Sequence, residues 1–578
     1  MDATSTAAGV DRDDRGVMLT GERIETATAA GHWPDRTAAD YLDDALRHHP
    51  DKVFVTDYKA EAGTRTTLSY RDIDRISRRI GAGLAAHGIA KGDVVAFQLP
   101  NWWEFAAIHL ACVRIGAVSN PLMPIFRARE LEFMLSFAET RAIFVPRRFR
   151  GFEYEPMLDG LRGRLPHLEH VFVLGGGASG SAGGGPGDHA GDNAFETVFL
   201  EERWEDEIDT RALFDERRVD PNEVIEICYT SGTTGQPKGV MHTSNTLAAC
   251  VGIGPARLAL GSDTVVLMAS PLAHQTGYLY GFLLPIRIGA RTILQDIWDP
   301  AVAARIIHDE QATFTIGATP FLADLAHSEA LERYPTASLE IFATAGAPVP
   351  RVLVQAATER LGASVVAGWG MSENGLVTCT LPGDPPEKIF GTDGGPWAGM
   401  QVRVVDEDRE PLPPGAPGAL QARGAANFVG YLKRPEAYAT DSDGWFDTGD
   451  IATMDESGYI RITSRAKDII IRGGENVPVV EVEELLYRHD AVRDAAIVAM
   501  PDPRLGERGC VFVTLRPGAS LDFEAMQHHL EAQQLAKQYW PERLEVIDEM
   551  PRTPSGKIQK YKLREIAAAF GPDAARPS

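Results

Sequence analysis

The sequence contains few cysteines and no long apolar run. Its five cysteines among 578 residues are widely spaced and never form a CxxC pair, which argues against a disulfide framework and a zinc site. We expect them to be buried thiols in a reducing cytosol. No stretch reaches the roughly 18 apolar residues that a transmembrane helix needs. Residues 1–16 do not resemble a signal peptide, and the last residues carry no peroxisomal or lipid-attachment signal. These features predict a cytoplasmic protein without integral membrane association.

Positive charge is also scarce. The chain has 57 Lys and Arg against 81 Asp and Glu, which gives a formal net charge of −24 at pH 7. This balance argues against binding to nucleic acid or to an anionic membrane surface, because both need an extended basic patch. It leaves room for a small basic site that binds an anionic ligand such as ATP or coenzyme A.

The chain does have the length and patterning of a large globular protein. At roughly 150 residues per domain, the length suggests several domains or fewer large ones. Helical and strand-like segments alternate from about residue 70: a helical pattern over 73–86, a strand over 94–99, a helix over 102–115 and a strand over 117–119. This alternation predicts α/β layers around a largely parallel sheet.

Changes in composition predict the domain organisation. We expect an α/β fold with a large multi-layer N-terminal domain of mixed sheets over residues 18–465, which includes a small β-rich part near residues 401–422. Residues 1–17 are expected to form a disordered tail. The Gly-rich residues 175–192 are expected to form a flexible insertion, because they cannot bury enough apolar area to become ordered. Residues 466–578 predict a small α+β C-terminal domain.

The most specific motif is a Ser/Thr/Gly-rich segment with a lysine, YTSGTTGQPKG, at residues 229–239. Glycines let backbone N–H groups approach phosphate oxygens, and the hydroxyls and the lysine supply further donors. It is not a Walker A loop, because Gly239 follows Lys238 where that motif needs Ser or Thr. The alternative for a generic loop of this composition is a mobile surface turn. The residues expected to contact phosphate are Thr230, Ser231, Gly232, Thr233, Thr234, Gly235 and Lys238.

Four further segments, in the same order along the chain, resemble the adenylate-forming superfamily of acyl- and aryl-CoA synthetases, peptide-synthetase adenylation domains and beetle luciferases. They are GWGMSE at 368–373, GWFDTGD at 444–450, SRAKD at 464–468 with RGGEN at 472–476, and PRTPSGK at 551–557. With the phosphate loop they cover roughly residues 68–564. The resemblance implies that a carboxylate attacks the α-phosphorus of ATP to form acyl-AMP, which then reacts with coenzyme A.

The resemblance also implies where the nucleoside binds. Trp369 would offer a flat face to adenine, with Gly370 beside it and Ala347 on the adenine side of the site. Asp450 would accept hydrogen bonds from the ribose hydroxyls, and Arg465 would add a donor to the same sugar. For a single Trp or Asp taken alone, the alternatives are a place in the core and a role in a turn.

A magnesium ion would be held by Glu373, the only acidic residue of its motif, together with Thr233. Mg²⁺ prefers oxygen ligands and bridges to phosphates. Ser372 stands where the family usually has Thr and would contact the nucleotide. A surface glutamate in a turn is the alternative for Glu373.

The C-terminal motifs imply two conformations. Lys557 would neutralise carboxylate and phosphate oxygens during adenylation. The small domain would then rotate about Lys467, so that a different face of this domain lines the site where the thiol of coenzyme A reacts. Gly473 and Gly474 would line the channel for the pantetheine arm, where side chains would obstruct it, although a tight turn would also explain these glycines.

The acyl group would lie beside His274, which would orient or gate the carboxylate, with Phe321 and Gly346 in the pocket wall. No acidic residue in these segments would pair with a substrate ammonium, which disfavours an amino-acid activator. The PLAHQTG segment at 271–277 and GENVPVV at 474–480 look most like cyclohexanecarboxylate–CoA ligase and medium-chain synthetases. The expected substrate is therefore a medium-chain or alicyclic monocarboxylic acid, with ATP, Mg²⁺ and coenzyme A as the other reactants.

Two rival functions stay open at this point. An acyl-AMP ligase could load a separate carrier protein in place of free coenzyme A. A non-catalytic nucleotide-binding scaffold could keep the fold, although the intact Glu373, Asp450 and Lys557 argue against it. The sequence does not fix the oligomeric state, for which a homodimer is the candidate.

Overall fold

A computed structural model of the chain describes residues 15–175, 193–230, 237–346, 349–473, 475–553 and 556–570. Most of the predicted tail and most of the Gly-rich insertion lie outside these residues. The chain divides into two compact units. The first comprises residues 1–316, 371–377 and 424–439, and the second comprises residues 317–370, 378–423 and 440–578.

A six-stranded sheet in the first unit carries the phosphate-loop motif. All neighbouring strands are parallel except the last pair, which is antiparallel. In spatial order the strands are β8 (His170–Leu174), β5 (Ala142–Pro146), β3 (Val94–Phe97), β4 (Val118–Pro121), β9 (Val224–Thr230) and β10 (Lys238–Thr243). The chain between β9 and β10 is therefore anchored at both ends in the sheet.

A second set of strands in the first unit is mixed. Three neighbouring pairs are parallel, while β1 and β2 form an antiparallel pair. In order these strands are β2 (Thr64–Ser69), β1 (Val53–Lys59), β12 (Arg291–Gln295), β11 (Val265–Met268) and β13 (Phe314–Gly317). The mixed sheets expected for the N-terminal domain are present.

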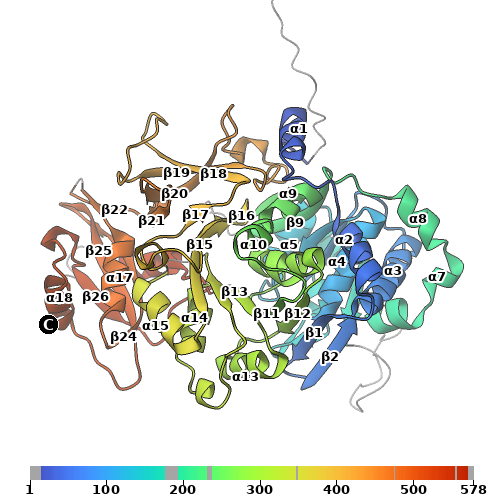
Figure 1. Cartoon of the computed structure of the whole chain (residues 1–578), viewed down its shortest axis with the longest axis horizontal. Helices are drawn as coiled ribbons and strands as arrows, with labels where there is room; N and C mark the ends of the chain where they lie inside the picture. Colours follow the sequence, from blue (N-terminus) through green and yellow to red (C-terminus); the bar gives the residue numbers. More distant parts are fainter. Residues whose placement is uncertain are drawn as a thin grey trace, which may run out of the picture. The chain divides into compact units, whose positions relative to one another are not determined.

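Helices α2 (Ala38–His48), α3 (Tyr70–Ala86) and α4 (Trp103–Ile115) lie side by side in the first unit (Figure 1). Helix α3 begins at a capping box, in which Ser69 and Asp72 satisfy each other's backbone N–H groups. Its buried face carries Ile73, Ile76 and Ile80 at helical spacing. The apolar stripe and the cap explain why the helix forms at this point.

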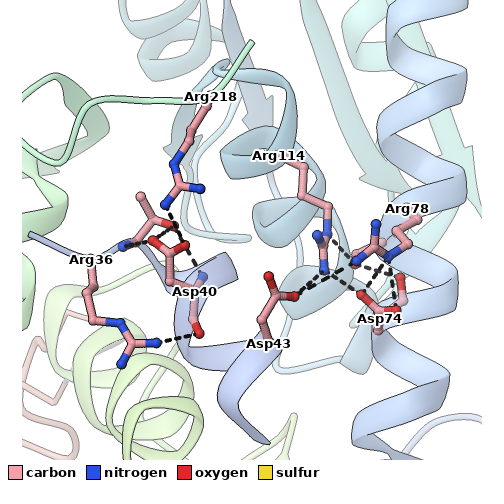
Figure 2. Close-up of polar contacts among 9 residues, drawn as sticks. Arg36, Asp40, Asp43, Asp74, Arg78, Arg114 and Arg218 are labelled. Atoms are coloured by element: carbon pink, nitrogen blue, oxygen red, sulfur yellow. Dashed lines mark hydrogen bonds and ion pairs between the residues drawn. The ribbon is translucent and has the colours of Figure 1, made fainter. Parts of the chain in front are cut away.

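Ion pairs link these three helices at one edge (Figure 2). Arg114 of α4 is 6% exposed and lies 2.5 Å from the carboxylate of Asp74 on α3. Arg78 of α3 pairs with the same carboxylate at 2.9 Å. Asp43 of α2 lies 3.9 Å from both guanidinium groups. The nearly buried Arg114 thus has the paired carboxylate that a buried charge requires.

The second unit contains the short β-rich part expected near residues 401–422. Its four strands are β18 (Met400–Val405), β19 (Gly418–Gly424), β20 (Phe446–Met454) and β21 (Ile460–Arg465), in this order. The parallel pair β14 (Ile341–Thr344) and β15 (Ser364–Met371) lies in the same unit with α14 (Thr319–Ala326) and α15 (Arg351–Leu361). Strand β20 carries Asp450, and β21 ends at Arg465.

The residues after Arg465 form a five-stranded sheet with helices, as the α+β prediction requires. The strands are β22 (Ile470–Arg472), β23 (Glu475–Val477), β24 (Val492–Asp502), β25 (Gly506–Leu515) and β26 (Arg543–Val546). Helices α17 (Val479–Tyr487), α18 (Phe523–Ala532) and α19 (Lys560–Ala568) accompany them. A separate apolar core packs α17 and α18 on these strands. The boundary at residue 466 and the mobility of this part stay predictions.

All five cysteines are free and buried, as expected. Among the residues that the structure describes, no helix combines the length and apolar character needed to cross a bilayer.

Candidate active site

The phosphate-loop motif bridges two neighbouring strands of the first unit. Thr230 ends β9 and is the register partner of Lys238, which begins β10. The Lys238 ammonium lies 4.6 Å from the centre of the Tyr431 ring, in cation–π range. Of the predicted phosphate contacts, Thr230 and Lys238 are therefore neighbours on adjacent strands. The others, Ser231, Gly232, Thr233, Thr234 and Gly235, lie outside the described residues.

Glu373, the predicted magnesium ligand, is 6% exposed and is tied to the 424–439 segment by two contacts. The hydroxyl of Tyr431 donates to its Oε1 at 2.7 Å. Its carbonyl oxygen accepts the backbone N–H of Phe428 at 2.7 Å. Burial and the negative charge of Glu373 together raise the pKa of Tyr431. The tyrosine is therefore held as a neutral donor that orients the carboxylate.

The chemistry of Glu373 fits a hard cation such as Mg²⁺, because a buried, oriented carboxylate offers the oxygen donors that this ion prefers. No group of three or more His, Cys, Asp or Glu side chains arranged to hold a metal occurs among the described residues. A single carboxylate with substrate phosphates is a common way to bind magnesium, since the ion keeps much of its water.

His242 fixes the backbone next to Glu373. It lies on β10, is fully buried, and its Nε2 is 2.8 Å from the carbonyl oxygen of Ser372. Its Nδ1 lies 3.0 Å from the hydroxyl oxygen of Thr246. Burial lowers the pKa of His242 to about 4, so the ring is neutral at pH 7 and its Nε2–H donates to the carbonyl. The ring joins the strand after the phosphate loop to the Ser372–Glu373 peptide.

His274 caps the short helix α11 (Gln275–Gly277). Its Nδ1 accepts the backbone N–H of Thr276 at 3.3 Å, and the ring is half-buried. The next residue, Gln275, is buried and donates to the carboxyl of Glu226 on β9 at 3.2 Å. The predicted acyl-side histidine is thus followed directly by a residue that contacts the phosphate-loop strand.

In the second unit, Trp369 and Asp450 form one hydrogen-bonded group with Arg465. Trp369 Nε1 donates to Asp450 Oδ2 at 2.9 Å, and Arg465 Nε lies 2.7 Å from Oδ1. Asp450 is 2% exposed and Trp369 is 7% exposed. A carboxylate has about four acceptor positions, so two protein donors leave capacity for ribose hydroxyls. The structure brings these three predicted residues together, with Gly370 next in the chain.

Lys557 lies in a turn that is held by hydrogen bonds to Thr553 and Arg552. Its N–H donates to the Thr553 hydroxyl at 3.0 Å, and its carbonyl accepts the Thr553 N–H at 2.7 Å. Arg552 donates to the carbonyl of Gly556 at 2.7 Å. The lysine is exposed as a residue, but partial desolvation of its ammonium, with the charge of Arg465, lowers its pKa to about 8. The charge of Asp450 opposes this shift, so the ammonium is electrostatically coupled to the Asp450 carboxylate.

The remaining predicted positions differ in what surrounds them. Lys467 is exposed in a short turn of 3₁₀ helix, Ala466–Asp468. Gly346 has a φ of +82° and no atom within 4 Å of an added Cβ, while Phe321 is buried on α14. Gly473 has a φ of +61°, so a turn alone already favours glycine at this position. Ala347 and Gly474 lie outside the described residues.

Sequence reasoning missed Tyr431, His242 and Glu226. Tyr431 lies 58 residues from Glu373 along the chain, and no local pattern links them. Glu226 had a detectable signal, because it interrupts an otherwise apolar strand, Val224–Thr230. A charged residue within a buried strand is rare and indicates a special environment.

Comparison with known proteins identifies the family of this chain. Residues 42–432 match the family of AMP-binding enzymes, and residues 481–557 match the AMP-binding enzyme C-terminal domain. A medium-chain fatty-acid–CoA ligase of Escherichia coli (strain K12) is 37% identical over 540 residues, which are 93% of this chain and 91% of the relative. A salicylyl-CoA synthase / salicylate adenylyltransferase of a Streptomyces species is 32% identical over 94% of this chain and 96% of its own.

The fold is also found among solved structures. A crystal structure of ATP-bound MatB from Rhodopseudomonas palustris has a TM-score of 0.79 and 26% identity, and the match covers 94% of this chain and all of the other. The two family matches contain the segments at 229–239, 368–373 and 551–557, whereas the segments at 444–450, 464–468 and 472–476 lie between them. The chain belongs to the family of AMP-binding enzymes.

Proposed function

We propose that this acid–CoA ligase activates a medium-chain or alicyclic monocarboxylic acid. Its membership of the family, with acid–CoA ligases among its relatives, establishes an AMP-forming acyl-CoA synthetase. The observation that carries the substrate class is the 37% identity, over 93% of the chain, to a medium-chain fatty-acid–CoA ligase. The small residues on both sides of Gly346, and the absence of Asp and Glu from residues 271–277, 319–322 and 344–348, support an uncharged acyl group.

The reaction has two steps. A carboxylate oxygen forms a bond to the α-phosphorus of ATP, and the bond from that phosphorus to the bridging oxygen breaks, so that pyrophosphate leaves. The sulfur of coenzyme A then attacks the acyl carbonyl carbon, AMP leaves with the oxygen that joined it to the acyl group, and the thiol proton passes to solvent. Both steps build negative charge on oxygen, which positioned donors stabilise.

Roles for the chain's own residues follow from their contacts. Asp450, held by Trp369 and Arg465, would accept the ribose hydroxyls while the indole face supports adenine. Lys238 and the loop before it would bind the phosphates, and Lys557 would stabilise the charge that develops during adenylation. His274 would orient the acyl carboxylate.

Glu373, with Thr233, would hold Mg²⁺, which supplies charge neutralisation at the phosphates. Tyr431 and His242 would keep the carboxylate and its backbone in place for this ligand role. Ser372 and Ala347 would complete the nucleotide contacts.

The second step is proposed to use a different arrangement of the C-terminal residues. Lys467 would undergo the change in backbone angles, and Gly473 with Gly474 would line the channel that holds the pantetheine arm of coenzyme A. Under this proposal residues 18–465 and 466–578 move as separate domains. We further propose that the enzyme is a cytoplasmic homodimer. Light scattering on the purified protein measures its mass in solution and so tests the dimer.

A pyrophosphate-release screen tests the substrate class. Acids from acetate to dodecanoate, with cyclohexanecarboxylate and benzoate, are compared with and without coenzyme A. We expect the highest kcat/KM for acids such as octanoate or cyclohexanecarboxylate, with acyl-CoA as the product. A preference for acetate or for benzoate would contradict the substrate class. Pyrophosphate release without transfer to coenzyme A would favour loading of a carrier protein, and no release with any acid would favour a non-catalytic scaffold.

A further inference from the structure

The turn that carries Lys557 is tied to the C-terminal sheet by the guanidinium of Arg552. Arg552 Nη1 donates to the carbonyl of Gly556 at 2.7 Å, and its Nη2 donates to Oδ1 of Asp494 at 2.6 Å. Gly556 directly precedes Lys557 and has a φ of +86°. Because a guanidinium is planar and presents its donors in a fixed fork, the two contacts together hold the turn at a set distance from Asp494.

The carboxylate of Asp494 is held in turn by the hairpin of β24 and β25. Asp494 and Thr514 are register partners on these antiparallel strands, and the Thr514 hydroxyl donates to Oδ2 of Asp494 at 2.8 Å. Arg493 Nε lies 3.4 Å from the same oxygen, but its side chain is 55% exposed, so this pair contributes little. One oxygen of Asp494 therefore contacts the partner strand, while the other contacts Arg552.

The ion pair between Asp494 and Arg552 is largely shielded from water. The exposed fraction is 18% for the Asp494 side chain and 24% for the Arg552 side chain. Removing one partner from such a pair leaves the other charge partly desolvated and unpaired, which costs more than the loss of a surface pair. The pair is thus able to restrict the turn that it joins to the sheet.

The restricted turn packs against the start of α14. A Cβ atom added to Gly556 would lie 3.3 Å from Cγ of Pro320 and 3.5 Å from Cβ of Ala318, so the two segments are in close contact. Pro320 belongs to the 319–322 segment that is expected to wall the acyl pocket. The backbone next to Lys557 is therefore positioned from two sides, by Arg552 and by this segment.

We propose that Asp494 is a positioning residue for the adenylation step, which acts through Arg552 on the turn of Lys557. The inference rests on the proposed function, in which the Lys557 ammonium stabilises the charge that develops on oxygen. Such a charge is effective only when it is held in place before the reaction begins. A lysine ammonium sits on a long flexible stem, so its placement depends on how firmly its backbone is held.

The test separates the two half-reactions in Asp494→Asn, which keeps the size of the side chain and removes its charge. Acyl-AMP formation from octanoate and ATP, measured in a single turnover without coenzyme A, should fall about tenfold in maximum rate, since the weakened hydrogen bond joins two charged groups. The ATP concentration for half-maximal rate should not change. Thioester formation from prepared octanoyl-AMP and coenzyme A should stay near the wild-type rate. Arg552→Lys keeps the charge without the fork and should show the same split.

A double variant distinguishes positioning from a purely structural role. If Asp494 acts only through Lys557, then Asp494→Asn adds no further loss of acyl-AMP formation to Lys557→Ala, because the interaction that it supports is already absent. A structural role would add to that loss and would slow both half-reactions. Asp490→Asn is the matched control, because Asp490 is an exposed aspartate shortly before β24, and it should match wild type in both half-reactions.

Each result has a definite consequence. A wild-type rate of acyl-AMP formation in Asp494→Asn overturns the positioning role while the proposed function stands, and so does an equal loss of both half-reactions or an additive loss in the double variant. If Asp494→Asn does not fold, Thr514→Val replaces it, and a smaller loss confined to adenylation is expected. Unchanged adenylation in Thr514→Val then overturns the role. No pyrophosphate release from wild type with any acid, or unchanged adenylation in Lys557→Ala, contradicts the proposed function and the positioning role with it.

Discussion

The indole nitrogen of Trp369 donates a hydrogen bond to Oδ2 of Asp450 across 2.9 Å. The residue expected to support adenine therefore also fixes the carboxylate expected to bind ribose. Neither side chain is more than 7% exposed, so each limits the conformations of the other. This link joins the two expected nucleoside contacts into a single unit, whose parts can be separated by substitution.

Trp369→Phe keeps an aromatic face and removes the donor. A hydrogen bond to a charged group contributes about 1.5–3 kcal/mol, so we expect KM for ATP to rise at least tenfold while KM for the acid changes little. Initial rates at varied ATP and at varied acid measure the two constants, with a melting curve to confirm folding. A rise in both constants, or in neither, would contradict a role specific to the nucleoside.

Tyr431→Phe removes the hydroxyl that holds Glu373. The carboxylate loses an orienting hydrogen bond, so we expect the magnesium concentration for half-maximal activity to rise by about tenfold, with a smaller effect at saturating magnesium. Tyr438→Phe is the control, because the Tyr438 hydroxyl donates to the carbonyl of Phe428 at 3.4 Å and not to Glu373. The same magnesium dependence in both variants would argue against the role of Tyr431.

Glu226 should make stability depend on pH. Burial raises its pKa from an ordinary 4.5 to about 8 in the folded protein, so between these values the folded state binds more protons than the unfolded state. Stability therefore falls as pH rises through this window and is flat above it. Each unit of the pKa difference corresponds to about 1.4 kcal/mol, or about 5 kcal/mol in all.

Glu226→Gln has no proton to lose, so its advantage over wild type should grow from pH 5 to pH 8. Denaturant unfolding of both proteins across this range measures the difference. Parallel curves would show that Glu226 titrates at an ordinary pKa in the folded protein.

Lys557→Ala should slow one step of the reaction only. Loss of one preorganised charge should reduce the rate of acyl-AMP formation by roughly 10²–10³, while thioester formation from prepared acyl-AMP continues near the wild-type rate. Because the pKa of Lys557 is about 8, adenylation by wild type should also decline as pH rises through 8 and the ammonium is lost. Lys562→Ala, at an exposed lysine of α19, should change neither step. Equal loss of both half-reactions in Lys557→Ala would remove its adenylation-specific role.

Lys467→Pro tests the proposed pivot. Proline fixes φ and restricts the preceding residue, so acyl-AMP should still form while acyl-CoA output falls. Lys467→Ala removes the same side chain and keeps the backbone free, and it should retain more thioester formation than the proline variant. Normal acyl-CoA output from folded Lys467→Pro would place the pivot elsewhere.

The sequence predicted those parts of the site whose residues lie in contiguous motifs. The Trp369, Asp450 and Arg465 group was predicted as three nucleoside contacts, although their mutual hydrogen bonds were not. Local patterns could not reveal Tyr431 beside Glu373, because the contact depends on how distant segments pack. Nor could they reveal that Glu226 faces Gln275, 49 residues away.

Apolar periodicity predicted the fold class and most of the helices and strands, but not the residues at which they begin and end. Strands β24 and β25 pair along Val492–Asp502 and Gly506–Leu515, beyond the apolar runs at 495–500 and 510–515. The added residues, such as Asp494 and Glu507, are polar and give no strand pattern. They extend the strands because hairpin pairing satisfies their backbone groups.

The central claim is that an acyl adenylate lies on the path to acyl-CoA, and oxygen-18 in the carboxylate of the acid tests it directly. If the carboxylate attacks the α-phosphorus, each turnover with octanoate, ATP and coenzyme A must leave one oxygen-18 atom in AMP, and pyrophosphate must carry none. Mass spectrometry of the AMP measures the label. Labelled AMP formed together with octanoyl-CoA is the predicted result. Unlabelled AMP, or ADP with labelled phosphate, would contradict the account.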